Sequence, residues 1–172
     1  MVGVFQKMIP SLFSGDHARR PFLYVGAHNG RIQFGDELRK ANYDITILEI
    51  FPPNVTFLQQ EITWAKTVQG DVREETSFTD GQFDVALWSH GPEHILKTEL
   101  VAAVTELERV SSGAVILACP WGLYDQGICY GNPHEQHISH YDGEEFEALG
   151  YSVSRTGIKD RRGSNVIAVK YL

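Results

Sequence analysis

The sequence predicts an α/β fold: a mostly parallel β-sheet covered by helices on both faces, which makes a three-layer sandwich. Short apolar runs alternate with segments of helical periodicity along most of the chain. Strands that alternate with helices are typical of parallel sheets, because each parallel connection has to cross over the sheet. The last two apolar runs are joined only by residues 157–164, which favours an antiparallel C-terminal strand pair.

The expected elements follow from these apolar runs and from apolar residues at helical spacing. Proline is tolerated in the first turn of a helix, so Pro52 and Pro53 mark a helix start. Residues 83–88 are nearly all apolar, as expected for a strand that is buried on both faces. In chain order, the sequence predicts a strand at 22–25, a helix at 31–42, a strand at 45–49, a helix at 52–65, strands at 67–69 and 83–88, a helix at 95–110, a strand at 114–119, a helix at 144–149 and strands at 151–156 and 165–171.

The length of 172 residues predicts a single domain with a sizeable core. Within it, residues 1–20 are expected to form an N-terminal helix or cap, and residues 120–141 a substrate loop or lid. A crossover loop usually needs only a few residues, so a long loop rich in aromatic residues, Gly and His at the carboxyl side of the sheet suggests a substrate wall.

Composition limits the partners that we expect. Fifteen Lys and Arg against 22 Asp and Glu give a net charge of −7, which argues against a nucleic-acid partner held through its phosphates. Cys119, in an expected strand, and Cys129, in a loop, form neither a disulfide framework nor a zinc pattern. Apolar runs are too short for a membrane span, and residues 1–20 lack a signal-peptide core. We therefore expect a cytoplasmic protein without a membrane partner, whose oligomeric state the sequence leaves open.

A glycine turn after the first strand is the main sign of a binding site. Gly26 and Gly30 leave room for a ligand to approach the backbone, where free N–H groups at a helix start favour an anionic or carboxylate-bearing group. Glu49 ends the second strand, where an acidic residue can accept hydrogen bonds from ribose hydroxyls. A solvated strand end is the alternative for Glu49. Together these residues predict a nucleoside-containing ligand.

Several segments then resemble class I S-adenosylmethionine-dependent methyltransferases, over about residues 20–172. VGAHNG (25–30) resembles the family's glycine-rich motif, and FDVALWSHGPEHI (83–95) is similar to its FDxVxxxxxLEHV segment. GDV (70–72), LERVSSGAVIL (107–117) and EALGYSV (147–153) look like later family motifs, in the family's order. The resemblance implies the seven-stranded Rossmann-like methyltransferase fold.

The resemblance also implies S-adenosylmethionine as the cofactor. Asp71 would contact the adenine, although it could equally cap the following turn. Two positions depart from the family pattern: Tyr24 stands where an acidic residue is usual, which would weaken cofactor binding, and His28 stands at the middle glycine. Glu93 and His94 are expected to have a structural role. The expected cofactor-binding residues are Val25, Gly26, Ala27, His28, Gly30, Glu49, Ile50, Asp71, Val72, Trp88 and Ser89.

The loop at 120–141 supplies the expected acceptor-binding residues. Three imidazoles and a carboxylate, from His134, His137, His140 and Glu135, are sufficient metal ligands, but their spacing matches no zinc signature. Exposed polar groups in a lid are the commoner explanation, so no metal site is predicted. The expected substrate-binding residues are Trp121, Tyr124, Tyr130, Asn132, His134 and His137.

The predicted activity is methyl transfer from S-adenosylmethionine to a small or medium-sized acceptor. His90 follows the fourth strand and is the expected general base, with His137 as the next candidate, although His90 could instead hydrogen-bond the lid. The alternative is a catalytically degenerate nucleoside-binding or protein-interaction module on the same fold, with aromatic residues of the lid as interface anchors. A nicotinamide-dependent dehydrogenase fits the later motifs poorly. The sequence does not identify the acceptor.

Overall fold

The computed structural model describes residues 19–28 and 35–172, so nearly all of the N-terminal helix or cap expected at 1–20 lies outside the described residues. Seven strands form one sheet: β1 (Arg20–Val25), β2 (Tyr43–Glu49), β3 (Lys66–Gln69), β4 (Phe83–Ser89), β5 (Ser111–Pro120), β6 (Ser152–Thr156) and β7 (Asn165–Tyr171). The helices are α3 (Gly35–Lys40), α4 (Pro52–Glu61), α5 (Leu100–Val110) and α6 (Glu144–Ala148), with 3-10 turns at Pro92–His94, Lys97–Glu99 and Pro133–Glu135.

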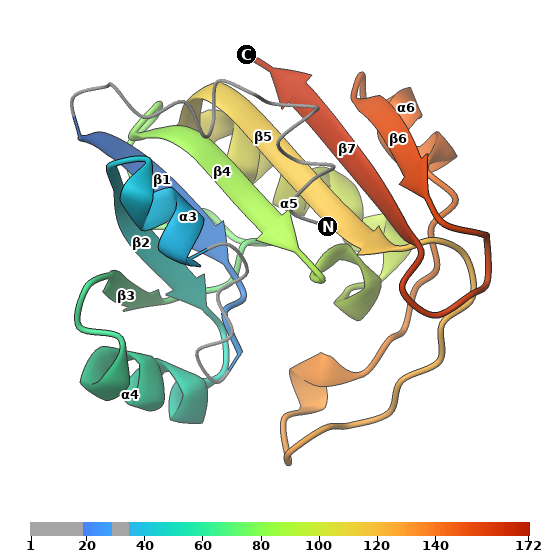
Figure 1. Ribbon diagram of the computed structural model, residues 1–172, viewed down its shortest axis with the longest axis horizontal. Coiled ribbons are helices and arrows are strands. Elements are labelled where there is room, and N and C mark those ends of the chain that lie inside the picture. Colours follow the sequence, from blue (N-terminus) through green and yellow to red (C-terminus); the bar gives the residue numbers. More distant parts are fainter. Residues whose placement is uncertain (1–18, 29–34) are drawn as a thin grey trace.

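The sheet has the strand order β3-β2-β1-β4-β5-β7-β6. The pairs among β1 to β5 are all parallel, whereas β7 is antiparallel to both β5 and β6. The predicted mostly parallel sheet with an antiparallel C-terminal pair is therefore confirmed. In Figure 1 the arrowheads of β1, β2, β4 and β5 point toward one edge, and the loop after β5 extends from that edge.

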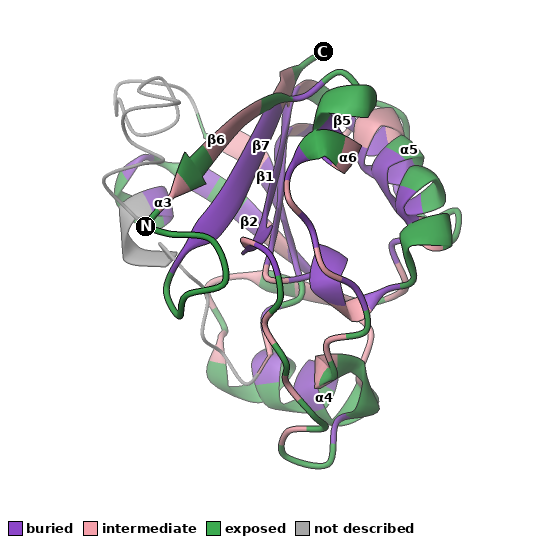
Figure 2. Cartoon of the chain, turned by 90° about the vertical axis from the view of Figure 1, so that its right-hand side faces the viewer, coloured by how far each residue is buried: buried purple, intermediate pink, exposed green. Residues whose placement is uncertain are grey.

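Helices cover both faces of the sheet, as expected for a three-layer sandwich. Leu38 of α3 and Leu58 of α4 belong to one buried cluster, which includes Ile47 of β2. Val104 of α5 and Phe146 of α6 belong to a second cluster on the other face. Figure 2 shows α3 and α5 on opposite sides of the purple, buried strands. Among the described helices, none combines the length and the apolar character that crossing a membrane would require.

Two predicted helices are too long by several residues, whereas those predicted to end at 42 and 149 end one or two residues earlier, at Lys40 and Ala148. In the segment predicted as helix at 95–110, Ile95 and Leu96 are extended (φ/ψ −114°/161° and −66°/144°). A 3-10 turn follows at Lys97–Glu99, and α5 begins only at Leu100. Glu99 Oε2 accepts a hydrogen bond from the Leu96 N–H (2.8 Å), which fixes this break. The helix predicted to reach residue 65 ends at Glu61, because Ile62 leaves helical geometry (φ −109°, ψ 57°). Apolar periodicity continues past both breaks, so it could not reveal them.

Candidate functional site

A cavity of about 650 Å³ opens at the edge where the parallel strands end. This volume lies within the usual range for small-molecule sites, and the carboxyl edge is where open α/β sheets bind ligands. Its wall combines the strand ends with the loops that follow β3, β5 and β6. The residues predicted for the site that line it are Val25, Gly26, His28, Glu49, Ile50, Asp71, Val72, Trp88, Ser89, His90, Tyr124, Asn132, His134 and His137.

Glu49 connects the glycine turn to the start of α4. The residue is only 4% exposed. Its Oε2 accepts a hydrogen bond from the Ala27 N–H (3.1 Å) and its Oε1 accepts one from the Phe51 N–H (3.0 Å). Burial raises the pKa of the Glu49 carboxyl above its ordinary value, although these two amides act in the opposite direction. Each carboxylate oxygen can accept a further hydrogen bond, so Glu49 can still bind hydroxyl groups in the cavity.

The turn after β1 has the geometry that the sequence predicted for a ligand cradle. Gly26 has φ +71°, a left-handed conformation that glycine adopts without strain, and its N–H donates to Leu48 O (2.9 Å). A Cβ atom at Gly26 would meet no atom within 4 Å, so the backbone here is open to the cavity. Ala27 does not line the cavity wall, but its N–H donates the hydrogen bond to Glu49. Gly30 lies outside the described residues.

Asp71 begins the turn after β3 and supports it locally. Its Oδ1 accepts a hydrogen bond from the Arg73 N–H (2.9 Å), and its carboxylate pairs with the Arg73 guanidinium (2.6 Å). Burial would raise the pKa of Asp71, but the hydrogen bonds from Arg73 outweigh it and lower that pKa. Arg73 also pairs with Glu99 (2.9 Å). Asp71 therefore has the turn-capping contact that the sequence left open, while an adenine contact stays a prediction.

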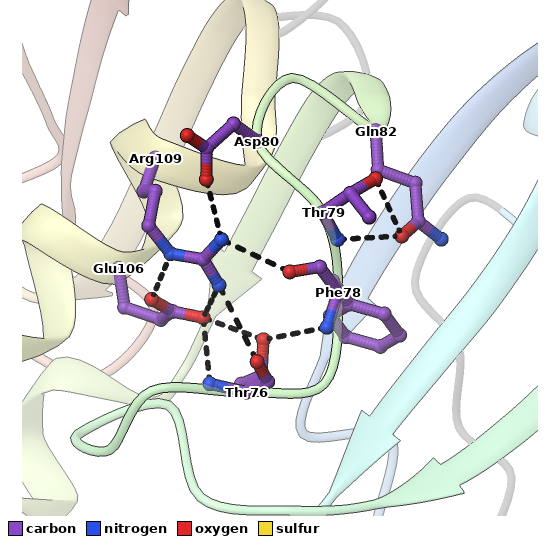
Figure 3. Close-up of polar contacts among 7 residues, drawn as sticks. All are labelled: Thr76, Phe78, Thr79, Asp80, Gln82, Glu106 and Arg109. Atoms are coloured by element: carbon purple, nitrogen blue, oxygen red, sulfur yellow. Dashed lines mark hydrogen bonds and ion pairs between the residues drawn. The ribbon is translucent and has the colours of Figure 1, made fainter.

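A polar network fixes the segment that continues from this turn to β4 (Figure 3). Glu106 of α5 accepts hydrogen bonds from the N–H and the hydroxyl of Thr76, and from the guanidinium of Arg109. Arg109 in turn donates to Phe78 O (2.9 Å) and pairs with Asp80 (2.7 Å). The network ties the segment between β3 and β4 to α5.

The end of β4 brings Trp88 and His90 to the cavity. A Cβ atom at Gly91 would lie 1.6 Å from Trp88 Nε1, so only glycine allows the indole to pack there. His90 has φ +55°, and its Nδ1 lies 3.3 Å from Glu93 Oε1. Burial alone would lower the pKa of His90, but the hydrogen bond and charge of Glu93 raise it overall.

The loop predicted as a lid lies partly against the cavity. His28 Nδ1 lies 2.9 Å from Glu135 Oε1, which joins the loop to the glycine turn. His137 Nδ1 lies 2.6 Å from Tyr124 O, and burial lowers the pKa of this imidazole. Two expected substrate residues do not line the wall: Trp121 packs against the core, and Tyr130 is 81% exposed.

Several lining residues were not predicted from the sequence. They come from the turn after β4, the loop after β5 and the β6–β7 connection, and they include Glu93, His94, Glu135, Thr156, Gly157, Ser164 and Asn165. The antiparallel direction of β7 was a usable signal. A strand that runs against a parallel sheet begins at the carboxyl edge, so the loop that precedes it must lie beside the site.

The sheet, the glycine turn and the buried acid at the end of β2 define a nucleoside-binding α/β protein of the Rossmann-like type. A family model described as "Methyltransferase domain" matches residues 23–118, more than half of the chain. The chain therefore belongs to this family, and the predicted class I, S-adenosylmethionine-dependent methyltransferase fold is confirmed. A search among curated protein sequences gave no significant match.

Solved structures with the same fold include several methyltransferases. An S-adenosylmethionine-dependent methyltransferase from Methanosarcina mazei has a TM-score of 0.70 at 14% identity, over 95% of this chain and 96% of that one. A second, from Archaeoglobus fulgidus, has a TM-score of 0.65 at 17% identity, over 98% and 92% of the two chains. Magnesium protoporphyrin IX methyltransferase from Synechocystis PCC 6803, solved with bound S-adenosylmethionine, has a TM-score of 0.65 at 15% identity, over 98% and 78%.

Proposed function

We propose that this protein transfers the methyl group of S-adenosylmethionine to a small or medium-sized acceptor. The observation that carries the proposal is Glu49: a buried carboxylate, held by the amide of the glycine turn, at the wall of a cavity of about 650 Å³. Such a carboxylate suits the two hydroxyls of a ribose. Family membership supports the same cofactor.

The residues present fit this cofactor. Gly26 leaves the backbone open to the cavity, and Glu49 has acceptor capacity left for hydroxyl hydrogen atoms. Ile50, Val72 and Trp88 supply apolar wall on which a purine can pack. We therefore assign the nucleoside to the side of the cavity formed by β1, β2 and the turn after β3.

The chemistry requires few dedicated groups. Bound S-adenosylmethionine supplies an electrophilic methyl carbon: the acceptor's lone pair bonds to it, while the electrons of the broken carbon–sulfur bond pass to the positively charged sulfur and neutralise it. The protein has to align the acceptor and exclude water. For an oxygen or nitrogen acceptor, it also has to take the proton that the acceptor loses.

We place the acceptor beside His90, between the end of β4 and the loop after β5. His90 and His137 line this part of the cavity, together with Tyr124, Asn132 and His134. His90 Nδ1 faces Glu93, so its Nε2 is the atom that we assign to the acceptor's proton. His137 is the second candidate.

A second candidate function is a non-catalytic module that acts by partner contact. It is favoured by the exposed apolar residues of the loop after β5, with Leu123 at 55%, Ile128 at 61% and Tyr130 at 81% exposure. Turnover separates the two functions. An enzyme passes labelled methyl from S-adenosylmethionine to at least one member of a panel of amine, hydroxyl and carboxylate metabolites, whereas a non-catalytic module leaves every member unlabelled.

Calorimetry with S-adenosylhomocysteine tests the cofactor assignment directly. Glu49→Ala should weaken binding by about 1.5 to 3 kcal/mol, roughly 10- to 150-fold, because charge-assisted hydrogen bonds to the ribose are lost. Glu61→Ala, at the exposed end of α4, is the matched control and should bind like the unaltered protein. Binding of NAD without any binding of S-adenosylhomocysteine would contradict the proposal.

A further inference from the structure

Glu93, His94 and His137 form a cluster in the wall of the cavity. Glu93 and His94 belong to the 3-10 turn after β4, and His137 comes from the loop after β5. One potential ligand atom from each of the three lies within 4.8 Å of the other two. Within residues 19–28 and 35–172, this is the one grouping of three or more potential metal ligands. Of the four potential ligands considered from the sequence, His134, Glu135, His137 and His140, only His137 belongs to this cluster.

The two imidazoles are held in a tautomer suited to metal binding. His94 Nδ1 lies 3.1 Å from Gln136 O, and His137 Nδ1 lies 2.6 Å from Tyr124 O. A backbone carbonyl can only accept a hydrogen bond, so each Nδ1 carries the proton and each Nε2 keeps a lone pair. Metal-binding histidines have this arrangement, in which the second nitrogen donates to a carbonyl or carboxylate.

Glu93 provides an independent reason to expect a cation. The residue is 2% exposed, and its Oε2 is buried without a hydrogen-bond partner. Its Oε1 lies 3.3 Å from His90 Nδ1 and 3.9 Å from His137 Nε2. In the described part of the chain, no Lys or Arg lies within ion-pair distance of this carboxylate. A buried carboxylate with an unsatisfied oxygen is costly unless a positive charge compensates it.

We propose that Glu93, His94 and His137 bind a divalent first-row transition metal ion, with Zn²⁺ as the probe. Two imidazoles and one carboxylate suit such ions, whereas Mg²⁺ and Ca²⁺ prefer ligand sets made of oxygen. Three protein ligands leave coordination positions open, and all three residues line the cavity. An acceptor oxygen could occupy an open position beside His90, and this last step rests on the methyl transfer proposed above.

The test is Zn²⁺ binding to protein first stripped with EDTA, measured by competition with a chromogenic chelator. We expect one ion per chain, bound more tightly than Mg²⁺ by several orders of magnitude. Glu93→Gln, His94→Ala and His137→Ala should each weaken Zn²⁺ binding at least about tenfold. Loss of a residue that only supports a ligand already weakens metal binding by that factor, so loss of a ligand itself should cost no less. His140→Ala is the control: it lies in the same loop, outside the cluster, and should bind like the unaltered protein.

A spectroscopic measurement on the unaltered protein does not depend on how the variants fold. Co²⁺ bound to the cluster should give visible absorption bands that Zn²⁺ displaces. Absence of stoichiometric Zn²⁺ binding, or equal affinity in folded His94→Ala and His137→Ala, would overturn the site. Calorimetry with S-adenosylhomocysteine in EDTA tests the cofactor pocket separately, so failure of the metal site and failure of the methyl transfer are distinguishable.

Discussion

His90 is held by the backbone in a conformation that few side chains adopt. Its φ of +55° turns the chain sharply after β4, and its N–H donates to Ala118 O (2.7 Å), so the turn is fixed to the neighbouring strand. The left-handed backbone conformation costs a non-glycine residue about 1 kcal/mol or more. It is therefore kept only where the surrounding structure imposes it. The imidazole is thereby directed to the cavity wall and not into the sheet.

At this position we expect His90→Ala to lower the rate of methyl transfer by about 10²-fold, the usual size of a general-base effect. Single-turnover kinetics measures that rate, and calorimetry should show S-adenosylhomocysteine binding unchanged, because His90 does not support Glu49. His140→Ala is the control and should keep its activity. A His90→Ala variant with full activity would leave alignment alone to explain catalysis.

The candidate site was only partly predictable at the residue scale. Gly26 and Glu49 could be found because a glycine turn and a strand-end acid have a fixed spacing in this kind of sheet. His94 and His137 could not be brought together, since their contact depends on the path of a loop with no periodic pattern. Trp121 was predicted to bind substrate because it belongs to an aromatic-rich loop, but it packs against the core.

Helix α5 belongs to the same buried cluster as Val72 and Trp88, which line the cavity. Its buried Glu106 holds Thr76 and Arg109, and through them the segment between β3 and β4. Burial would raise the pKa of Glu106, but the hydrogen bonds from Arg109 and Thr76 lower it below its usual 4.5. A depressed carboxyl pKa contributes stability above the unfolded-state pKa, and this contribution is lost as the pH falls through the folded-state value.

Accordingly, Glu106→Gln should reduce the free energy of unfolding at pH 7 by about 2 to 3 kcal/mol, because charged hydrogen bonds are lost in a buried setting. The difference from the unaltered protein should shrink as the pH falls below about 4.5, where the carboxyl becomes protonated in the unfolded chain. Urea unfolding at several pH values measures both effects. Glu75→Gln, an exposed change in the same segment, should have no comparable effect. A pH-independent difference would show that the ionised network is not the cause.

The loop after β5 should serve the acceptor more than the cofactor. Shortening residues 122–131 removes Tyr124, whose carbonyl holds His137, and Gln126, whose side chain holds Glu135 O (2.8 Å). We expect methyl transfer to be abolished while the affinity for S-adenosylhomocysteine stays within a few-fold, since Glu49 and Gly26 lie on other elements. Labelled transfer and calorimetry measure the two quantities. Equal loss of both would mean that the loop supports the cofactor or the fold.

The order and direction of the elements were predictable because each strand carries its own apolar run. The break at Ile95 and Leu96 was not, because it depends on Glu99 binding a backbone N–H and leaves the apolar spacing intact. Several predicted strands were too short. β2 begins at Tyr43 and β5 at Ser111, since pairing with a neighbouring strand extends a strand past its apolar run.

For the whole molecule, occupancy of the cavity should be visible as thermal stability. A ligand that binds only the folded chain adds about 2.7 kcal/mol at 100 times its dissociation constant. For a chain of this length, that raises the melting temperature by roughly 5 to 10 °C. Differential scanning calorimetry with S-adenosylhomocysteine should show this rise. Glu49→Ala should show a smaller rise at the same concentration, and an equal rise in both would place the ligand elsewhere.

β7 is the last strand along the chain, yet it lies between β5 and β6 in the sheet. Until residues 165–171 have emerged from the ribosome, β5 is therefore an open edge, and it carries the apolar side chains of Ile116 and Leu117. Exposed apolar edges pair readily with other chains, so the nascent protein is prone to aggregate through β5 in the interval before β7 is made. The sheet is therefore complete only once residues 165–171 have been made, and chaperones would be needed before these residues appear rather than after.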